Sequence, residues 1–256
     1  MTTRVDLNCD MGESFGAWHM GDDDNVLRYI SSANVACGFH GGDPRTMAKT
    51  VELAKDLGVS VGAHPGFPDL VGFGRRNLDV SRDEARTDVL YQIGALAAFC
   101  RRFDVPLQHV KPHGQLNNLA MTNRVLADAI VAGIRDFDPS LIVVAYGGEL
   151  AKAAESQGMP VAYEIFADRE YNSDGTLVSR QVPGAVISDS ARVVKRAIQM
   201  VEEGQVQAMD GTIIDLKVHT ICVHGDTPKA ASLVANLREA FHHAGIEVTP
   251  MSRIVR

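Results

Sequence analysis

Several features that would mark a specialised protein class are scarce in this sequence. Only 6% of its 256 residues are aromatic. Hydrophobic residues make up 45% of the chain and charged residues 22%, and this composition excludes a disordered, collagenous or coiled-coil chain. The longest apolar runs, such as Leu141 to Ala145, fall far short of the ~20 residues that span a bilayer. Met1 to Arg4 leads directly into a strand-like run, so we expect neither a signal peptide nor a membrane anchor.

Cysteine pairs and excess basic charge are also missing. The four cysteines, Cys9, Cys37, Cys100 and Cys222, have no CxxC spacing, and the sequence contains no N-x-[ST] glycosylation site. We therefore expect free thiols and a cytoplasmic location. The 32 acidic residues outnumber the 25 basic residues and give a net charge of −7, which argues against a nucleic-acid or anionic-membrane partner and favours a small molecule.

Common nucleotide and hydrolase motifs are absent as well. The sequence has no Walker loop, no GxGxxG motif after a strand and no HExxH motif. Gly58 to Gly62 matches the letters of G-x-S-x-G, but this segment runs from a helix end into a strand. A nucleophile elbow needs the opposite order, strand into helix, so the match does not predict a catalytic serine.

Short β-branched runs alternate with amphipathic segments along the whole sequence, which is typical of βα units around a parallel sheet. No linker interrupts the alternation, so we predict one domain, a parallel β/α barrel, over residues 1–256. The predicted strands are Val5–Asn8, Ser32–Ala36, Val59–Ala63, Leu107–Lys111, Leu141–Ala145, Val161–Ile165 and Thr220–His224.

The predicted helices have recognisable end signals. Asp43-Pro44 reads as an N-cap followed by proline at the first helical position, and Ser81 with Glu84 forms a capping box. Thr227-Pro228 opens the last long helix. Further helices are predicted over Asn123–Phe137, Glu149–Gln157 and Asp189–Glu203.

Polar side chains able to do chemistry follow six of the seven predicted strands. Because the carboxyl ends of parallel barrel strands open onto one face, residues far apart in sequence should meet in one pocket there. This convergence predicts an enzyme. The residues are Asn8, Asp10 and Glu13; His40 and Asp43; His64 and Arg75; Lys111 and His113; Asp168 and Arg169; and His224 and Asp226.

A histidine after a strand can simply satisfy a buried carbonyl group. Four of the nine histidines, His40, His64, His113 and His224, occupy equivalent positions after strands, which favours a functional role for the set, least for His224. Asp10, His40 and His64 could hold a divalent metal, and histidine with carboxylate favours zinc, iron or manganese.

The first predicted strand carries alternating polar residues. Asp6, Asn8 and Asp10 point the same way, toward the barrel interior or mouth. A buried carboxylate needs a partner, so Asp6 and Asp10 should pair with a cation such as a metal or Lys111. Alternatively, Asp6 accepts hydrogen bonds from backbone donors. Lys111 could stabilise developing negative charge while His113 transfers protons.

The segments that carry these residues resemble the LamB/YcsF family, the A subunits of 5-oxoprolinase, over essentially the whole chain. They are Asp6–Gly16, Ala33–Asp43, Gly62–Asp69, Gly72–Arg76, His109–Gly114, Phe166–Arg169 and Val223–Pro228. The family commonly has Ala-Leu-Tyr-Asn after the Lys-Pro-His-Gly motif, whereas this chain has Gln115 to Asn118. The role of that one tyrosine is therefore not carried over.

The resemblance implies a distorted parallel β/α barrel, similar to that of glycoside hydrolases and polysaccharide deacetylases. It also implies opening of 5-oxo-L-proline to L-glutamate with hydrolysis of ATP, with Mg²⁺, by a complex with two partner subunits. Phosphorylation of the amide oxygen would turn a poor electrophile into an activated imidate. A homo-oligomer is compatible with the sequence.

On that chemistry we expect three catalytic residues, Asp10, Lys111 and His113. Asp10, or a metal-bound water directed by His40 and His64, would supply the nucleophile, while Lys111 and His113 stabilise the oxyanion and protonate the leaving nitrogen. An arginine should bind the substrate carboxylate in a bidentate manner. The expected substrate-binding residues are Asn8, Arg75, Asp168 and Arg169.

Two other functions stay open at this point. A stand-alone metal-dependent deacetylase or amidohydrolase would need neither ATP nor partners. A non-catalytic subunit would use the polar ring only to hold a carboxylate or a sugar. Dependence of turnover on a nucleotide separates the first alternative from the ATP-dependent function, and unchanged turnover after pocket mutations would favour the second.

Overall fold

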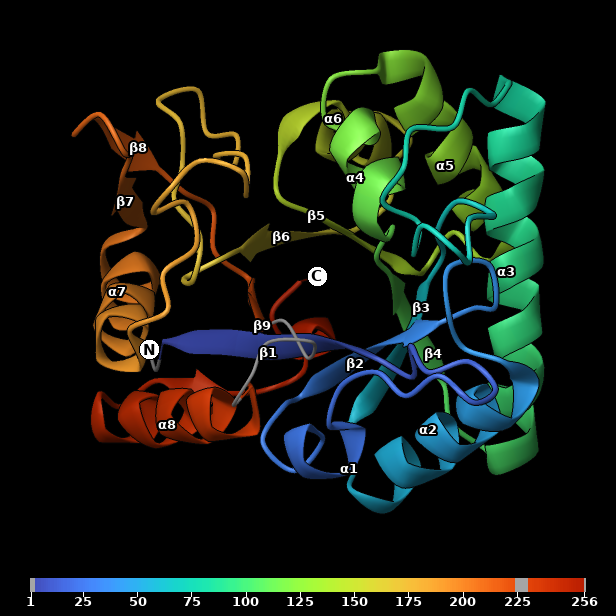
Figure 1. Ribbon diagram of the computed structural model, residues 1–256, viewed down its shortest axis with the longest axis horizontal. Coiled ribbons are helices and arrows are strands. Elements are labelled where there is room, and N and C mark those ends of the chain that lie inside the picture. Colours follow the sequence, from blue (N-terminus) through green and yellow to red (C-terminus); the bar gives the residue numbers. More distant parts are fainter. Residues whose placement is uncertain (1–2, 224–229, 256) are drawn as a thin grey trace.

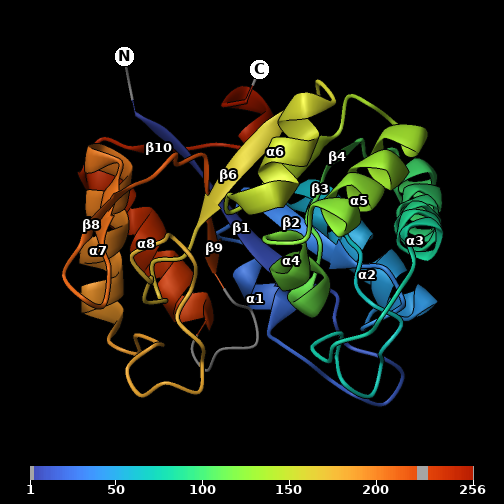
Figure 2. The same ribbon diagram turned by 90° about the horizontal axis from the view of Figure 1, so that it is seen from above.

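Parallel strands close into a barrel in the computed structural model, which describes residues 3–223 and 230–255 (Figures 1 and 2). Strand β1 pairs with β2 on one side and with β9 on the other, and every pairing around the ring is parallel. This confirms the α/β class and the distorted β/α barrel. The barrel strands are β1 Arg4–Met11, β2 Ser32–Ala36, β3 Ser60–His64, β4 Leu107–Val110, β5 Ile142–Ala145, β6 Val161–Ile165 and β9 Thr220–Val223.

Helices cover the outside of the barrel. In Figure 1, α7 and α8 pack on one side, and α2, α3 and α5 on the other. Their bounds are α1 Asp23–Val26, α2 Pro44–Asp56, α3 Arg82–Phe103, α4 Gly114–Ala120, α5 Arg124–Phe137, α6 Gly148–Ser156, α7 Ser190–Glu203 and α8 Ala230–His243. The Asp43 N-cap and the Ser81/Glu84 capping box are confirmed, whereas Thr227-Pro228 lies outside the described residues.

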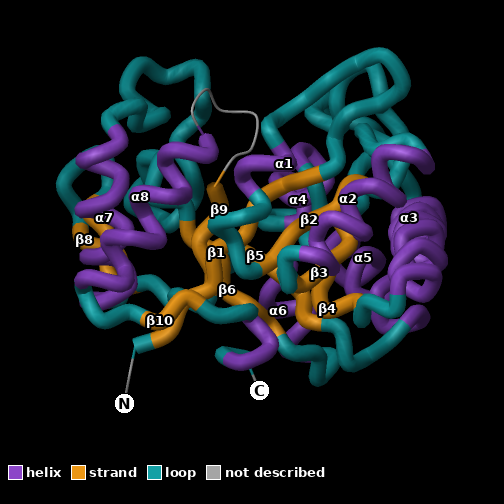
Figure 3. The backbone as a smooth tube through the Cα atoms, turned by 90° about the horizontal axis from the view of Figure 1, so that it is seen from below, coloured by secondary structure: helices purple, strands orange, loops and turns teal. Residues whose placement is uncertain are grey.

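The structure adds small elements that the sequence pattern did not predict. The antiparallel pair β7 Gln205–Gln207 and β8 Ile213–Asp215 lies outside the barrel beside α7. Strand β10 Glu247–Val248 pairs with the start of β1, at the end of the barrel opposite the long loops (Figure 3), and a short 3₁₀ turn, Met251–Arg253, follows it. Two or three residues are too few to show a hydrophobic period, so such elements escape pattern analysis.

Two chemically different layers fill the barrel interior. Near its amino-terminal end, Ile142, Val144, Ala162 and Met251 form a small apolar cluster. Above it, the interior is polar and almost fully buried. Asn8, for example, has no exposed surface, and its side-chain amide donates to Thr220 and Glu164. The main apolar core lies instead between the strands and the surrounding helices.

Asp6 is paired differently from the prediction. Its carboxylate accepts hydrogen bonds from the hydroxyl groups of Ser31, Ser32 and Thr220, rather than from a cation or backbone amides. Burial raises the pKa of Asp6 from its ordinary value of 3.8 to about 6, although these three hydroxyl groups oppose the shift. Hydroxyl groups on β2 and β9 could not be matched to Asp6 before the strand register was known.

All four cysteines are buried free thiols. Within the part of the chain that the structure describes, no helix combines the length and the apolar character that crossing a membrane requires.

The buried carboxyl group predicts a pH effect on stability. Because the pKa of Asp6 is higher in the folded state than in the unfolded chain, its contribution is fully present below about pH 4 and is lost as the pH rises through about 6. A shift of this size corresponds to about 3 kcal/mol. We expect Asp6→Asn to remove this component, so the difference in unfolding free energy between the two proteins should change across pH 4–7 in chemical denaturation. A constant difference would contradict the assignment.

Candidate active site

A cavity of about 380 Å³ opens at the carboxyl ends of the barrel strands. Six of the residues singled out in the sequence line it: Asp10, His64, Arg75, Lys111, His113 and Arg169. Its other walls include Gln115, Asn117, Asn118, Tyr146, Phe166, Leu177, Ser179, Arg180 and Gln181. The convergence predicted from the strand ends is therefore present in the fold.

Lys111, directly after β4, places its ammonium group between two carboxylates. Its Nζ lies 2.8 Å from Glu164 Oε1 and 3.0 Å from Asp10 Oδ1. Burial alone would lower the pKa of Lys111, but Asp10, Cys222 and Glu164 raise it well above its ordinary value. Lys111 is therefore a permanent cation on the cavity floor, and the predicted pairing of Asp10 with Lys111 is present.

Beside this pair, four side chains from separate loops gather their donor atoms. Glu13, His40, His64 and His113 each offer one oxygen or nitrogen, and these atoms all lie within 4.8 Å of one another. Glu13 Oε1 is 3.2 Å from His40 Nε2, 3.4 Å from His113 Nδ1 and 4.0 Å from His64 Nε2. The rings of His40 and His113 stack at a centroid distance of 3.6 Å.

Hydrogen bonds to the backbone fix which ring nitrogens face the group. His64 Nδ1 lies 2.6 Å from the Lys111 carbonyl oxygen, and His113 Nε2 lies 2.8 Å from the Phe73 carbonyl oxygen. A carbonyl oxygen only accepts, so these two nitrogens carry the hydrogens. The remaining nitrogens, His64 Nε2 and His113 Nδ1, face each other at 3.0 Å. Two facing lone pairs need a shared proton or a cation between them.

The same group fits a divalent metal. Ligands of a tetrahedral zinc ion with bonds of ~2.0 Å lie about 3.3 Å apart. Three pairs of donor atoms here are 3.0–3.4 Å apart, and Glu13 Oε1 and His64 Nε2 are 4.0 Å apart. Histidine nitrogens with one carboxylate also suit iron or manganese. Burial excludes water from most of the group, while His64 and His113 keep one side open to the cavity.

Of the three predicted ligands, His40 and His64 belong to this group of donor atoms, together with Glu13 and His113. Asp10 lies beside the group, with its Oδ1 3.0 Å from Lys111 Nζ and its Oδ2 3.4 Å from His64 Nε2. The side chain of His113 therefore faces two other histidines rather than open cavity alone. Gly12, in the turn that separates Asp10 from Glu13, has a φ of 65°.

Backbone contact between two loops brings Glu13 to His40. A Cβ atom at Gly41 would lie 2.7 Å from the carbonyl oxygen of Glu13, which is closer than real Cβ atoms approach backbone. Glycine at this position therefore lets the loop after β2 pack directly on the loop after β1. The result is the short separation between His40 and Glu13.

The cationic side of the cavity comes mainly from the segment after β6. Arg169 is only 7% exposed, and its Nη2 donates to the carbonyl oxygen of Val178 at 2.7 Å. Burial, and then the neighbouring charge of Arg180, lower the pKa of Arg169. Arg75 reaches the same cavity from the loop after β3, where its guanidinium lies 5.0 Å from the Phe73 ring centre.

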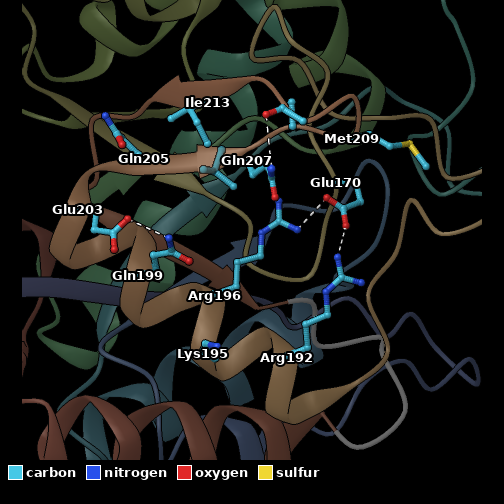
Figure 4. Close-up of a pocket in the computed structure, with 13 residues that line it drawn as sticks. Glu170, Arg192, Lys195, Arg196, Gln199, Glu203, Gln205, Gln207, Met209 and Ile213 are labelled. Atoms are coloured by element: carbon cyan, nitrogen blue, oxygen red, sulfur yellow. Dashed lines mark hydrogen bonds and ion pairs between the residues drawn. The ribbon is translucent and has the colours of Figure 1, made fainter.

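Glu170, the residue after Arg169, forms ion pairs that hold the segment after β6 against α7. Its two carboxylate oxygens lie 2.7 Å from Arg192 Nη2 and 2.8 Å from Arg196 Nη1 (Figure 4). Its main-chain N–H donates to Ala185, and its carbonyl accepts from Val178. Arg169 thus projects into the cavity from a segment that is anchored on its opposite side.

The remaining predicted residues lie elsewhere. Asn8 is buried below the cavity floor, where its Oδ1 is 3.3 Å from Lys111 Nζ, and Asp168 does not line the cavity. His224 and Asp226 fall outside the described residues. Sequence reasoning did not select Glu164, although a carboxylate within an otherwise apolar strand is a visible signal. Tyr146, directly after β5, also lines the cavity, and its hydroxyl group donates to Asn118 Oδ1 at 3.4 Å.

Comparison with known proteins shows one consistent likeness. Residues 5–256 match the model of the LamB/YcsF family. The chain is 52% identical, over 99% of its length and 100% of the relative, to the 5-oxoprolinase A subunit of Pyrococcus horikoshii. It is also 52% identical, over 98% of its length and 99% of the relative, to the 5-oxoprolinase A subunit of Clostridium beijerinckii.

Two solved structures extend the comparison. The lactam utilization protein of Thermus thermophilus is 46% identical with a TM-score of 0.92, over 96% of this chain and 99% of that one. A T48 deacetylase, 14% identical over 99% of this chain and 90% of that one, has a TM-score of 0.51 and shows the shared barrel fold alone.

The close packing at Gly41 predicts opposite effects for two glycine substitutions. Gly41→Ala would force its methyl group into the backbone of Glu13, and we expect a loss of about 1–3 kcal/mol in unfolding free energy. The control is Gly94→Ala, in the exposed part of α3 with no atom near the added methyl group, which should gain about 0.5–1 kcal/mol. Denaturant titration measures both, and equal effects would refute the packing argument.

Proposed function

The chain belongs to the LamB/YcsF family, and from that premise we propose that it is the A subunit of a 5-oxoprolinase, a hydrolase acting on a cyclic amide. The names of its 52% identical relatives and the solved lactam utilization protein support this function. The structural observation that carries it is the permanent Lys111 cation beside the Glu13/His40/His64/His113 group, both facing one small cavity.

Lys111 stabilises the charge that develops when the amide is attacked. A lactam carbonyl is a weak electrophile, and negative charge accumulates on its oxygen in the transition state. A fixed ammonium group in a water-poor site stabilises such charge far more than one in bulk water. Because Lys111 is buried and held by two carboxylates, it needs little reorganisation to do this.

Asp10 is the base that we assign to the attacking water. Its Oδ1 faces Lys111, while its Oδ2 lies 3.4 Å from His64 Nε2 at the cavity wall. A divalent ion held by Glu13, His40, His64 and His113 would supply Lewis-acid polarisation when bound. His113 donates its N–H to a backbone carbonyl and Lys111 keeps its charge, so we assign protonation of the leaving nitrogen to Asp10, which returns the proton that it takes from the attacking water.

We assign substrate binding to two arginines. Arg169 and Arg75 line the cavity, and a guanidinium group can bind the carboxylate of 5-oxoproline through two parallel hydrogen bonds. Asn8 and Asp168 do not line the cavity, so in this proposal they do not touch the substrate. Asn8 instead supports Lys111 from below.

ATP and the partner subunits complete the proposal. The relatives carry the name of one lettered subunit of 5-oxoprolinase, which supports a complex of several subunits. We propose two partners and ATP, with Mg²⁺, as the source of amide activation that yields glutamate. Within that complex, residues 1–256 act as one barrel domain. Four buried free thiols support a cytoplasmic location.

Reconstitution tests the function. Glutamate release from 5-oxoproline and ATP should require this chain together with its two partners. We expect Lys111→Met to lower turnover by about 100-fold or more, because it removes the cation that stabilises the oxyanion. Lys49→Met removes an exposed lysine that pairs with Asp24, and it should leave turnover unchanged.

Each alternative has its own signature in that assay. Turnover by the chain alone without ATP would replace the proposal with a stand-alone amidohydrolase, which the Glu13/His40/His64/His113 group would suit. Full turnover of the Lys111→Met complex would leave the chain with a binding role at most.

Metal binding tests the ligand set independently of activity. We expect the chelator-treated chain to bind about one equivalent of Zn²⁺ in isothermal titration calorimetry. His64→Ala and His113→Ala should weaken binding by about 100-fold or more, whereas Asp10→Asn should retain it because Asp10 is held by Lys111. Loss of binding in Asp10→Asn with retention in His113→Ala would restore the set of Asp10, His40 and His64.

A further inference from the structure

We propose that Glu164 is a positioning residue that holds the Lys111 ammonium group where the reaction needs it. This inference rests on the function proposed above, in which Lys111 stabilises the developing negative charge. Glu164 touches neither the cavity nor the group formed by Glu13 and the three histidines; it acts through Lys111.

The geometry places Glu164 directly beneath the lysine. It lies on β6, where Ala162 and Glu164 share the inward face, and its side chain has no exposed surface. Its Oε1 lies 2.8 Å from Lys111 Nζ and also accepts from Asn8 Nδ2 at 3.1 Å. The carboxylate therefore contacts the ammonium from the barrel interior, while Asp10 contacts it at 3.0 Å from the cavity side.

Stability alone does not account for a carboxylate here. Removing a carboxylate from water is energetically costly, and well-packed apolar residues often replace buried ion pairs without loss of stability. Glu164 also leaves its second oxygen, Oε2, without a hydrogen-bond partner among the described residues. A group placed only for stability would be fully satisfied, so the carboxylate is better explained by its effect on Lys111.

The contacts of Lys111 show what that effect is. A lysine side chain has a flexible four-carbon stem, and an ammonium group with only one counter-ion would move with that counter-ion. Here Nζ has Glu164 and Asn8 below, Asp10 at the side and Cys222 Sγ at 3.0 Å. These partners exceed its three N–H donors and fix the position of the charge.

Glu164 also shares the charge of Lys111 with Asp10. Without Glu164, Asp10 would be the sole carboxylate on a buried ammonium, and the two would draw together. Nζ would then move away from its place on the floor, and Asp10 would be less available to accept a proton from water. Both changes weaken the chemical step and leave the arginines that bind the substrate carboxylate unchanged.

The test is Glu164→Gln in the reconstituted complex. The substitution keeps the shape of the side chain and removes its charge. We expect kcat to fall by about 10-fold to 100-fold, with KM changed by less than about 2-fold, because misplacing a catalytic group affects the chemical step. The matched control is Asp6→Asn, another carboxylate-to-amide change inside the barrel that does not contact Lys111, and its kcat should be unchanged.

A crystal structure of the Glu164→Gln chain gives a readout independent of activity. We expect Nζ to lie nearer to Asp10 than in the parent chain. Unchanged kcat, an equal fall in kcat for both variants, or an unmoved Nζ would overturn the proposal. If the parent complex releases no glutamate, the proposed function fails, while the position of Nζ still decides the role of Glu164. If Glu164→Gln does not fold, the second variant is Glu164→Asp. Its shorter side chain moves the carboxylate away from Nζ, and its kcat should also fall.

Discussion

A single buried positive charge, the ammonium group of Lys111, imposes most of the constraints on the interior of this barrel. The interiors of parallel β/α barrels are usually packed with branched apolar side chains. Here that packing is confined to the cluster around Met251 and Ile142. Above it, the barrel must supply carboxylates for the charge, and then hydrogen-bond donors for the carboxylates. Asn8 contacts both charges, because its amide N–H donates to Glu164 and its oxygen accepts from Lys111.

The same constraint links the lysine to the neighbouring histidines. Asp10 faces Lys111 with one oxygen and His64 with the other, and the Lys111 carbonyl oxygen fixes the ring of His64. A change at Lys111 therefore reaches the Glu13/His40/His64/His113 group through two routes, one electrostatic and one along the backbone. Effects of substitutions in the two clusters should not add, since residues that share partners are coupled. The ammonium and the histidines are in this sense one site.

Sequence reasoning went furthest where a local rule decides the outcome. Strand parity correctly placed Asp6, Asn8 and Asp10 inside the barrel, and the convergence of strand ends brought Lys111 and the histidines together. It did not reach the features that depend on contacts with backbone far away in the sequence. The Phe73 carbonyl oxygen turns His113 toward His64, and the close backbone contact at Gly41 brings Glu13 to the histidines beside Asp10. Neither contact can be predicted from the spacing of residues along the chain. The alternation of side chains along β6, by contrast, is enough to place Glu164 inside the barrel.

In the proposed function, chemistry and substrate recognition depend on different parts of the fold. Asp10, His64 and Lys111 lie at the ends of barrel strands, whose pairing on both sides holds them in place. Arg169 belongs to the long segment between β6 and α7, outside the barrel ladder, and its position depends on the pairing of Glu170 with α7. A catalytic group must be held to a fraction of an ångström, whereas a segment that binds one end of a substrate can change shape without disturbing the reacting atoms. In this proposal, the barrel strands hold the reacting groups, and the segment between β6 and α7 binds the substrate carboxylate.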